Sequence, residues 1–144
     1  CDSGSVVQLN LKQMTSTINH IPIYTFHLLK SIKVLNLNGN GISGSMPPEI
    51  GLITNLNTLD LGSNGLNGSI PTEIGLLTSL SDFTWDGNEL SGSIPTEIGL
   101  MTSLYILELS KNELSGSIPT EIGLLTTLTR IDLFENELLN FTRE

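Results

Sequence analysis

The sequence repeats itself at a fixed interval of 24 residues. Asparagines, glycines and prolines keep this interval without an insertion. These are Asn40, Asn64, Asn88, Asn112 and Asn136; Gly44, Gly68, Gly92 and Gly116; and Pro47, Pro71, Pro95 and Pro119. A fixed period of roughly 20 to 50 residues is typical of proteins in which one structural unit stacks on the next. We therefore expect a single domain built as a one-dimensional stack.

Each unit begins with a short alternation of apolar and polar residues, which predicts a strand. In one unit, Leu59 and Leu61 are expected to point into the core, and Thr58 and Asp60 outward. Asn64 follows the strand, where an inward amide can satisfy backbone groups that would otherwise be buried without partners. The units therefore predict a parallel sheet, with a row of inward asparagines that bond to the backbone of the turns above and below.

The rest of the unit predicts a turn, a second short strand and a helical turn. Gly68 permits either a positive φ or a close backbone approach. Pro71 is expected to be the first residue of the helical turn, where its missing N–H is no loss. Glu73 would lie near the positive end of that turn, and Gly75 would end it.

These residues carry a family resemblance. The skeleton L-x-x-L-x-L-x-x-N-x-L-x-G-x-I-P resembles the plant-type leucine-rich repeat and covers residues 32–138 without a gap. The resemblance implies an α/β solenoid: a right-handed superhelix with a concave parallel sheet, short second strands, and short 3-10 or helical turns on the convex side. Receptor-like protein and kinase ectodomains, and polygalacturonase-inhibiting proteins, have such repeats.

The two ends depart from the repeat. We interpret residues 1–31 as a partial N-terminal cap with a degenerate first repeat, and residues 139–144 as a truncated repeat or a C-terminal cap. In the resembled family a cysteine at the position of Cys1 pairs with one further upstream. Here Cys1 is either a free thiol or half of a disulfide whose partner precedes this sequence. His20 and His27 lack accompanying ligands, so no metal and no cofactor is expected.

The charge and composition exclude several classes of partner. The formal net charge is -9, from 6 basic and 15 acidic residues. This argues against binding of nucleic acid, which requires a basic patch, and against an acidic membrane surface. The chain has no apolar run of transmembrane length and no signal peptide at its start, so direct membrane insertion is not expected. We interpret the chain as part of a longer, extracellular or cell-surface protein.

The regular units differ mainly at the outward positions of the first strand. Identical backbones with varied outward residues are what a binding surface requires, and the acidic members would favour a basic partner. The candidate partner-binding residues are Val34, Asn36, Asn38, Thr58, Asp60, Asp82, Thr84, Asp86, Tyr105, Ile106, Glu108, Ser110, Arg130, Asp132 and Phe134. The alternative is a merely solvated face, against which the aromatic and aliphatic members argue.

Other recurrent residues have simpler interpretations. Phe83 and Trp85 occupy inward leucine positions, so we expect them to fill the core, with the indole N–H bonded to a carbonyl. The glutamates at Glu73 and its equivalents are expected to be helix-start carboxylates. Stacked threonines can form turns or, as a different class of function, match a surface such as ice. The sequons at Asn67 and Asn140 are candidate glycosylation sites.

No catalytic arrangement is convincing. Glu108 and Asp132 lie at the same outward position of adjacent units, about 5 Å apart along the sheet, a spacing like that of a retaining glycosidase. An open, wet strand face offers no pocket to raise the pKa of one of them. We therefore expect no enzyme. The sequence favours a protein- or peptide-binding module of a receptor-like protein, with a secreted hydrolase inhibitor and surface or ice adsorption as alternatives.

Overall fold

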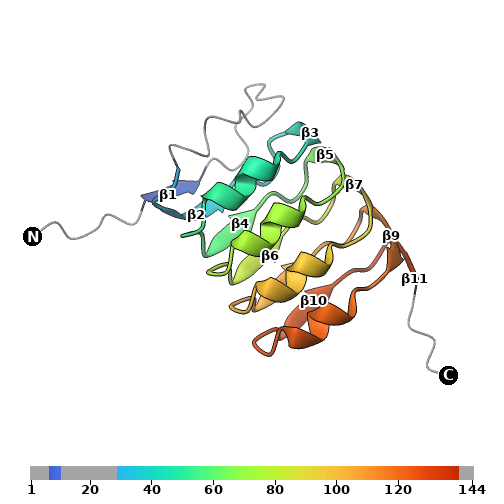
Figure 1. Cartoon of the computed structure of the whole chain (residues 1–144). Coiled ribbons are helices and arrows are strands. Elements are labelled where there is room, and N and C mark those ends of the chain that lie inside the picture. The colour runs from blue at the N-terminus through green and yellow to red at the C-terminus, as the bar shows by residue number, and fades with distance from the viewer. Residues whose placement is uncertain (1–6, 11–28, 140–144) are drawn as a thin grey trace, which may run out of the picture.

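The computed structural model describes residues 7–10 and 29–139, and within them it is a stack of similar coils (Figure 1). Two parallel sheets run along the stack. The first has the order β1-β2-β4-β6-β8-β10, and the second β11-β9-β7-β5-β3. The first-sheet strands are β1 Val7–Asn10, β2 Ile32–Asn36, β4 Thr58–Asp60, β6 Asp82–Thr84, β8 Ile106–Glu108 and β10 Arg130–Asp132. The second-sheet strands are β3 Ser43–Ser45, β5 Gly65–Gly68, β7 Glu89–Gly92, β9 Glu113–Ser117 and β11 Glu137–Leu139.

Short 3-10 helices close the coils opposite the first sheet. They are η1 Pro48–Leu52, η2 Thr72–Leu76, η3 Thr96–Leu100 and η4 Thr120–Leu124. The expected solenoid is confirmed: a parallel first sheet, short second strands and 3-10 turns on the convex side. No helix in the described part of the chain has the length and apolarity needed to cross a membrane.

The register of the first sheet follows the 24-residue period. Asn36 pairs with Asp60, Asp60 with Thr84, and Thr84 with Glu108. Because the register does not slip, equivalent side chains lie in straight rows across the sheet. Inward leucines, isoleucines and methionines fill the space between the layers, and those of the inner coils are buried.

The recurrent asparagines bond to the backbone of neighbouring coils, as the sequence predicts. The Oδ1 atom of Asn88 accepts a hydrogen bond from the N–H of Leu66 at 3.0 Å. Its amide donates to the carbonyls of Leu61 and Trp85, both at 3.1 Å. Each such residue thus satisfies backbone groups that the turn would otherwise leave buried and unpaired. Asn88 is itself buried, so these bonds are shielded from water.

The convex turns correct two details of the prediction. Pro71 is the residue before η2, with extended backbone (φ -68°, ψ 141°), and not the first helical residue. Gly75 lies within η2 instead of ending it. A Cβ atom on Gly75 would lie 2.7 Å from the carbonyl oxygen of Glu97. The glycine is therefore needed for the close approach of successive turns, whereas Gly68 is needed for its positive φ of 72°.

Phe83 and Trp85 fill the core, as expected, and contact each other edge to face with ring centroids 4.8 Å apart. The expectation for the indole N–H is wrong. Among the described residues, Nε1 of Trp85 is buried and has no hydrogen-bond partner. The larger ring occupies an inward leucine position, where the neighbouring core residues are apolar and offer no side-chain acceptor.

The last coil differs from the inner ones in the exposure of its core positions. Ile131 is 46% exposed, although Leu59, Phe83 and Leu107 at the equivalent positions are fully buried. A core position in a stack is covered by the coil on either side of it, and within the described residues this coil packs against one neighbour. The expectations for residues 1–6, 11–28 and 140–144, including Cys1, His20, His27 and Asn140, lie outside the described residues.

Candidate ligand-binding face

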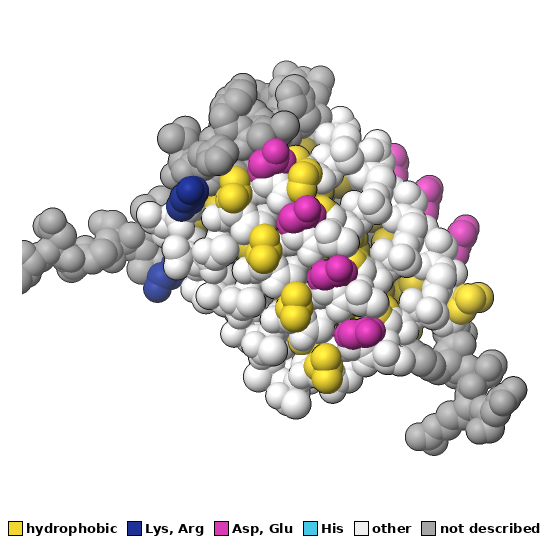
Figure 2. All heavy atoms as spheres, viewed as in Figure 1, with side chains coloured by type: hydrophobic (Ala, Val, Ile, Leu, Met, Phe, Trp, Pro, Cys, Tyr) yellow, Lys and Arg dark blue, Asp and Glu magenta, His cyan; other side chains and the backbone are white. Residues whose placement is uncertain are grey.

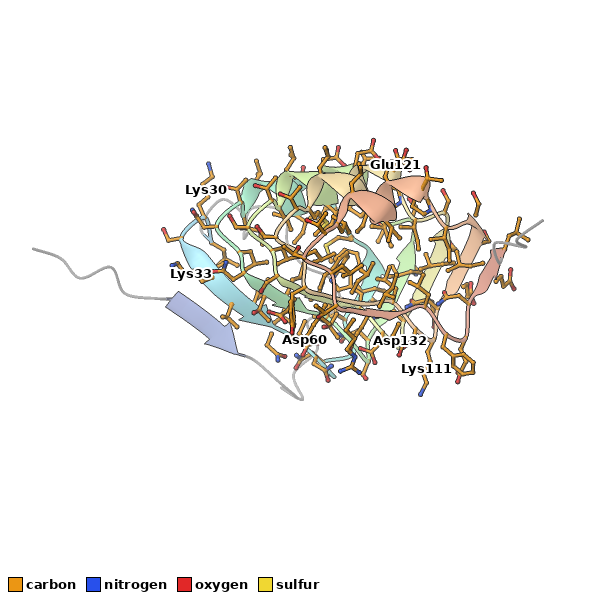
Figure 3. All side chains as sticks on the ribbon, turned by 90° about the horizontal axis from the view of Figure 1, so that it is seen from below. Lys30, Lys33, Asp60, Lys111, Glu121 and Asp132 are labelled. Carbon is orange, nitrogen blue, oxygen red and sulfur yellow. The ribbon has the colours of Figure 1, made fainter. Side chains whose placement is uncertain are left out.

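The candidate residues lie in rows on the outer side of the first sheet, which we call the strand face. One row holds Val34, Thr58, Asp82, Ile106 and Arg130, and the next holds Asn36, Asp60, Thr84, Glu108 and Asp132. A third row, just beyond the strand ends, holds Asn38, Asp86, Ser110 and Phe134, with Gly62 in the equivalent place. Tyr105 precedes β8 and is exposed. Asp60 and Asp132 point from the same side of the molecule, and Glu121 from the opposite side (Figure 3).

The part of the strand face nearest the N-terminus is a hydrogen-bonded amide and carboxylate cluster. Both Oδ atoms of Asp60 accept bonds from side-chain amides, Oδ2 from Asn36 at 2.9 Å and Oδ1 from Asn38 at 3.1 Å. Oδ1 also accepts the backbone N–H of Gly62 at 3.1 Å. Three donors thus hold the carboxylate of Asp60. It orders this part of the strand face and also gives it negative charge.

On the strand face, Gly62 is buried beneath the polar side chains of neighbouring coils. An ideal Cβ atom built on Gly62 would lie 2.5 Å from Oδ1 of Asp86 and 2.8 Å from Nδ2 of Asn38. The missing side chain therefore makes room for these two polar groups. No hydrogen bond to the Asp86 carboxylate is found among the described residues, in contrast to Asp82, which accepts bonds from Ser81 at 2.6 Å and Thr58 at 3.4 Å. Asp86 is the acidic group of this face with the most capacity for an outside donor.

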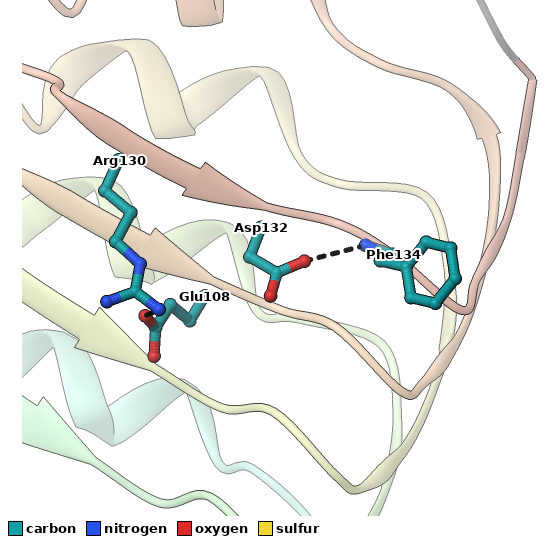
Figure 4. A network of polar contacts seen from close by, with 4 residues as sticks. All are labelled: Glu108, Arg130, Asp132 and Phe134. Carbon is teal, nitrogen blue, oxygen red and sulfur yellow. Dashed lines mark hydrogen bonds and ion pairs between the residues drawn. The ribbon is translucent and has the colours of Figure 1, made fainter.

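The part nearest the C-terminus combines an ion pair with exposed apolar side chains. The Arg130 guanidinium lies 2.9 Å from Oε1 of Glu108 (Figure 4). This pair bridges diagonally between coils, because Arg130 is in register with Ile106. Phe134 is 72% exposed and Tyr105 52% exposed, so both rings are available for contact with a partner. This end is therefore more apolar and has a smaller net charge than the centre.

The proposed glycosidase-like pair is not arranged for catalysis. Glu108 is bound to Arg130, while Oδ1 of Asp132 accepts the backbone N–H of Phe134 at 3.1 Å (Figure 4). These contacts keep both carboxylates occupied as acceptors, on a surface open to solvent. A general acid needs a carboxyl kept protonated by burial or by a neighbouring carboxylate. Neither carboxyl is buried, and Glu108 is bound to a guanidinium.

Three features of the strand face were not foreseen. The packing of Asp86 and Asn38 over Gly62 depends on the small size of the glycine, and a glycine at an outward position was the sequence signal for it. The diagonal pair of Glu108 and Arg130 follows from the 24-residue register. Ser110, in contrast, is only 8% exposed, so it offers little surface to a partner.

The remaining sequence candidates lie on other surfaces. Asn67 is exposed on β5 of the second sheet, away from the strand face. Thr72, Thr96 and Thr120 are exposed, and each hydroxyl donates to the carboxylate of the next residue, a glutamate, at 3.3 Å. These hydroxyls are thus directed to carboxylates, and not freely presented as a regular template for ice.

Comparison with known proteins agrees with the fold. The family model described as "Leucine Rich Repeat" matches residues 31–53, 55–77 and 103–125. The chain is similar to the ectodomain of the plant membrane receptor kinase GASSHO1/SCHENGEN3 from Arabidopsis thaliana, solved with CASPARIAN STRIP INTEGRITY FACTOR 2. The two are 38% identical with a TM-score of 0.88. The chain is a plant-type leucine-rich repeat protein.

Two further structures show the same repeat. The leucine-rich repeat ectodomain of the Arabidopsis receptor kinase HAESA, in complex with an IDA peptide hormone ligand, is 36% identical with a TM-score of 0.78. The BIR3–SERK2 complex from Arabidopsis thaliana contains a chain that is 41% identical with a TM-score of 0.73. Among curated proteins, the comparison gives no match.

This leucine-rich repeat chain is much shorter than the ectodomains it resembles. The GASSHO1/SCHENGEN3 match covers 91% of this chain and 16% of that one, and the HAESA match 83% and 20%. The BIR3–SERK2 match covers 76% and 58%. The similarity therefore covers the repeats of this chain, and most of each of the two receptor-kinase ectodomains lies outside the matched region.

Proposed function

We propose that the chain is a protein- or peptide-binding module that uses its strand face, and that it is the extracellular recognition part of a receptor-like protein. The observation that carries this proposal is the alignment of varied side chains in register on one face of an otherwise repetitive stack. Structures similar to it include receptor ectodomains solved with peptide hormones. In an extracellular setting, Asn67 is the described sequon asparagine on which a glycan would leave the strand face open.

The proposed ligand is an extended segment with basic residues. Four steps between adjacent strands, at about 4.8 Å each, make a face of about 19 Å, which an extended peptide spans with roughly six residues. Asp86 and Asp82 lie at the centre of this length and offer acceptors to a lysine or arginine. Tyr105, Ile106 and Phe134 would contact apolar side chains further along.

The test is a selection of short basic peptides from a display library against the whole chain, followed by equilibrium binding. The double variant Asp82→Asn, Asp86→Asn is expected to lower affinity by about ten-fold or more, because close charge pairs at interfaces contribute strongly. Glu89→Gln, Glu113→Gln is the matched control, because it makes the same change in net charge at exposed residues of the second sheet, outside the strand face.

The two variants separate a specific site from a general charge effect. A control that retains affinity while the strand-face variant loses it supports the proposal. Equal loss in both would mean that the ligand responds only to net charge. Unchanged affinity in the strand-face variant would contradict the proposed site.

A further inference from the structure

The convex side carries a second surface that the fold itself does not explain. In η2, η3 and η4 the same five residues recur as Thr-Glu-Ile-Gly-Leu. The isoleucines of η2 and η3 are buried in the core, but the leucines are not. We call the exposed leucines and the neighbouring glutamates the convex ladder: Leu76, Leu100 and Leu124 with Glu73, Glu97 and Glu121.

The leucines of the convex ladder are large apolar groups left in water. Leu76, Leu100 and Leu124 are 55%, 57% and 62% exposed, whereas the next residues, Leu77 and Met101, are fully buried. Scattered exposed leucines are normal, but these three lie in one row. Figure 2 shows hydrophobic side chains in a line across the 3-10 helices, with a line of acidic side chains beside them.

The rows are continuous because successive turns pack closely. A Cβ atom built on Gly51 would lie 3.0 Å from Cβ of Glu73 and 3.0 Å from Cδ1 of Leu76. A Cβ atom on Gly99 would lie 2.7 Å from Cβ of Glu121. Each glutamate thus sits directly over the glycine of the preceding turn, and no side chain separates the rungs.

The acidic row argues against a second copy of this chain as the partner and favours a partner with basic residues. Two copies of this chain pairing through their convex ladders would bring like-charged rows together, at an unfavourable electrostatic cost. A partner with leucine-like side chains flanked by lysine or arginine would bury the apolar row and neutralise the acidic row at once. The arrangement also suits a helix laid along the stack, because successive rungs pack in direct contact and an α-helix presents side chains again at every turn of about 5.4 Å.

We infer that the convex ladder is a docking site for a basic amphipathic α-helix of a partner protein, laid along the stack. Its leucines, at the spacing i, i+4, i+7, would contact Leu76, Leu100 and Leu124 in turn. Its basic residues would face Glu73, Glu97 and Glu121. This site is on the side opposite the strand face and does not depend on the function proposed there.

The test uses the 144-residue chain and a fluorescent peptide of about 14 residues, long enough for some four helical turns. The peptide carries leucines at i, i+4, i+7 and i+11, with lysines beside them. A second peptide has the same composition, reordered so that its leucines share no helical face. Saturable binding of the first peptide and at least about ten-fold weaker binding of the second are expected, because only the first presents a continuous apolar face.

Matched variants locate the binding. Leu76→Ser, Leu100→Ser, Leu124→Ser is expected to weaken it about ten-fold or more, and Glu73→Gln, Glu97→Gln, Glu121→Gln to weaken it less and to remove most of its salt dependence. Thr78→Ala, Thr102→Ala, Thr126→Ala changes the exposed threonines of the adjacent loops and is expected to alter affinity less than about two-fold. Emission from the buried Trp85 checks that each variant is folded.

Several results would overturn the inference. They are the absence of saturable binding, equal binding of both peptides, and indifference to the leucine variant. A loss of affinity in Asp82→Asn, Asp86→Asn would place the peptide on the strand face instead. Sedimentation showing that the chain self-associates through the same leucines would identify a second copy as the occupant.

Discussion

The strand face and the convex side are made by the same coils but differ in how their sequence varies. On the strand face the residue type changes at almost every coil, as from Asn36 to Asp60 to Thr84. On the convex side the half-buried Glu73 and the exposed Leu76 recur in the next two turns without change. A varied face is suited to one particular partner, whereas a repeated face is suited to a partner that is itself periodic. We propose on this ground that the two faces recognise different kinds of partner.

The largest expected effect on stability comes from a buried residue of the convex turns. Ile74→Ala should lower the free energy of unfolding by about 3 kcal/mol, because it empties a fully buried site in the stack. Leu76→Ala, two residues away and 55% exposed, should cost less than about 1 kcal/mol. Denaturant unfolding of both variants measures the difference. Equal costs would mean that the exposed leucines are structural, and the comparison between the faces would lose its basis.

The second prediction concerns the close approach that keeps the convex rows continuous. Gly75→Ala is expected to destabilise the fold by about 2 kcal/mol, because its Cβ would lie 2.7 Å from the carbonyl oxygen of Glu97. Gly123→Ala is the matched control, since nothing lies within 4 Å of its Cβ. Thermal unfolding should place the control at or slightly above the parent. A destabilised control would show that these glycines are needed for their backbone conformation and not for space.

A smaller effect is expected in the core beneath the strand face. Trp85→Phe removes a buried N–H that lacks a partner among the described residues, which offsets part of the cost of the smaller ring. The net loss should be about 1 kcal/mol or less, compared with about 3–5 kcal/mol for truncation of a buried tryptophan to alanine. Chemical denaturation followed by circular dichroism measures it. A loss as large as for alanine would imply that the indole N–H is satisfied in solution.

The smallest effect on stability is expected at the ion pair of the strand face. The Arg130 side chain is 65% exposed, so Arg130→Ala should change the free energy of unfolding by less than about 0.5 kcal/mol. The same change frees Glu108 and should raise affinity for a basic peptide. Binding of one selected peptide to parent and variant measures this. Lower affinity would mean that the arginine itself contacts the ligand, and that the ligand is not basic at this end.

The stacked fold can be predicted from the sequence because the residues that each coil needs recur in several units. The inward leucines and the asparagines follow from local patterns that recur at one interval, and Gly68 adopts a positive φ, one of the two alternatives that its position allowed. Details that depend on side-chain contacts between coils are harder to predict from the sequence. Three such details need the actual distance between neighbouring side chains: the pairing of Arg130 with Glu108, the packing over Gly62 and the unpaired indole of Trp85. The close packing at Gly75 likewise depends on the distance between neighbouring coils.

The proposed binding mode is tested most directly by mapping a selected basic peptide on the isotope-labelled 15.5 kDa chain by NMR. We predict that chemical-shift changes cluster in residues 58–60, 82–86 and 106–108, which share the strand face, and leave residues 72–76 and 96–100 unchanged. Changes confined to the convex turns, with none in those strands, would contradict the assignment of ligand recognition to the strand face.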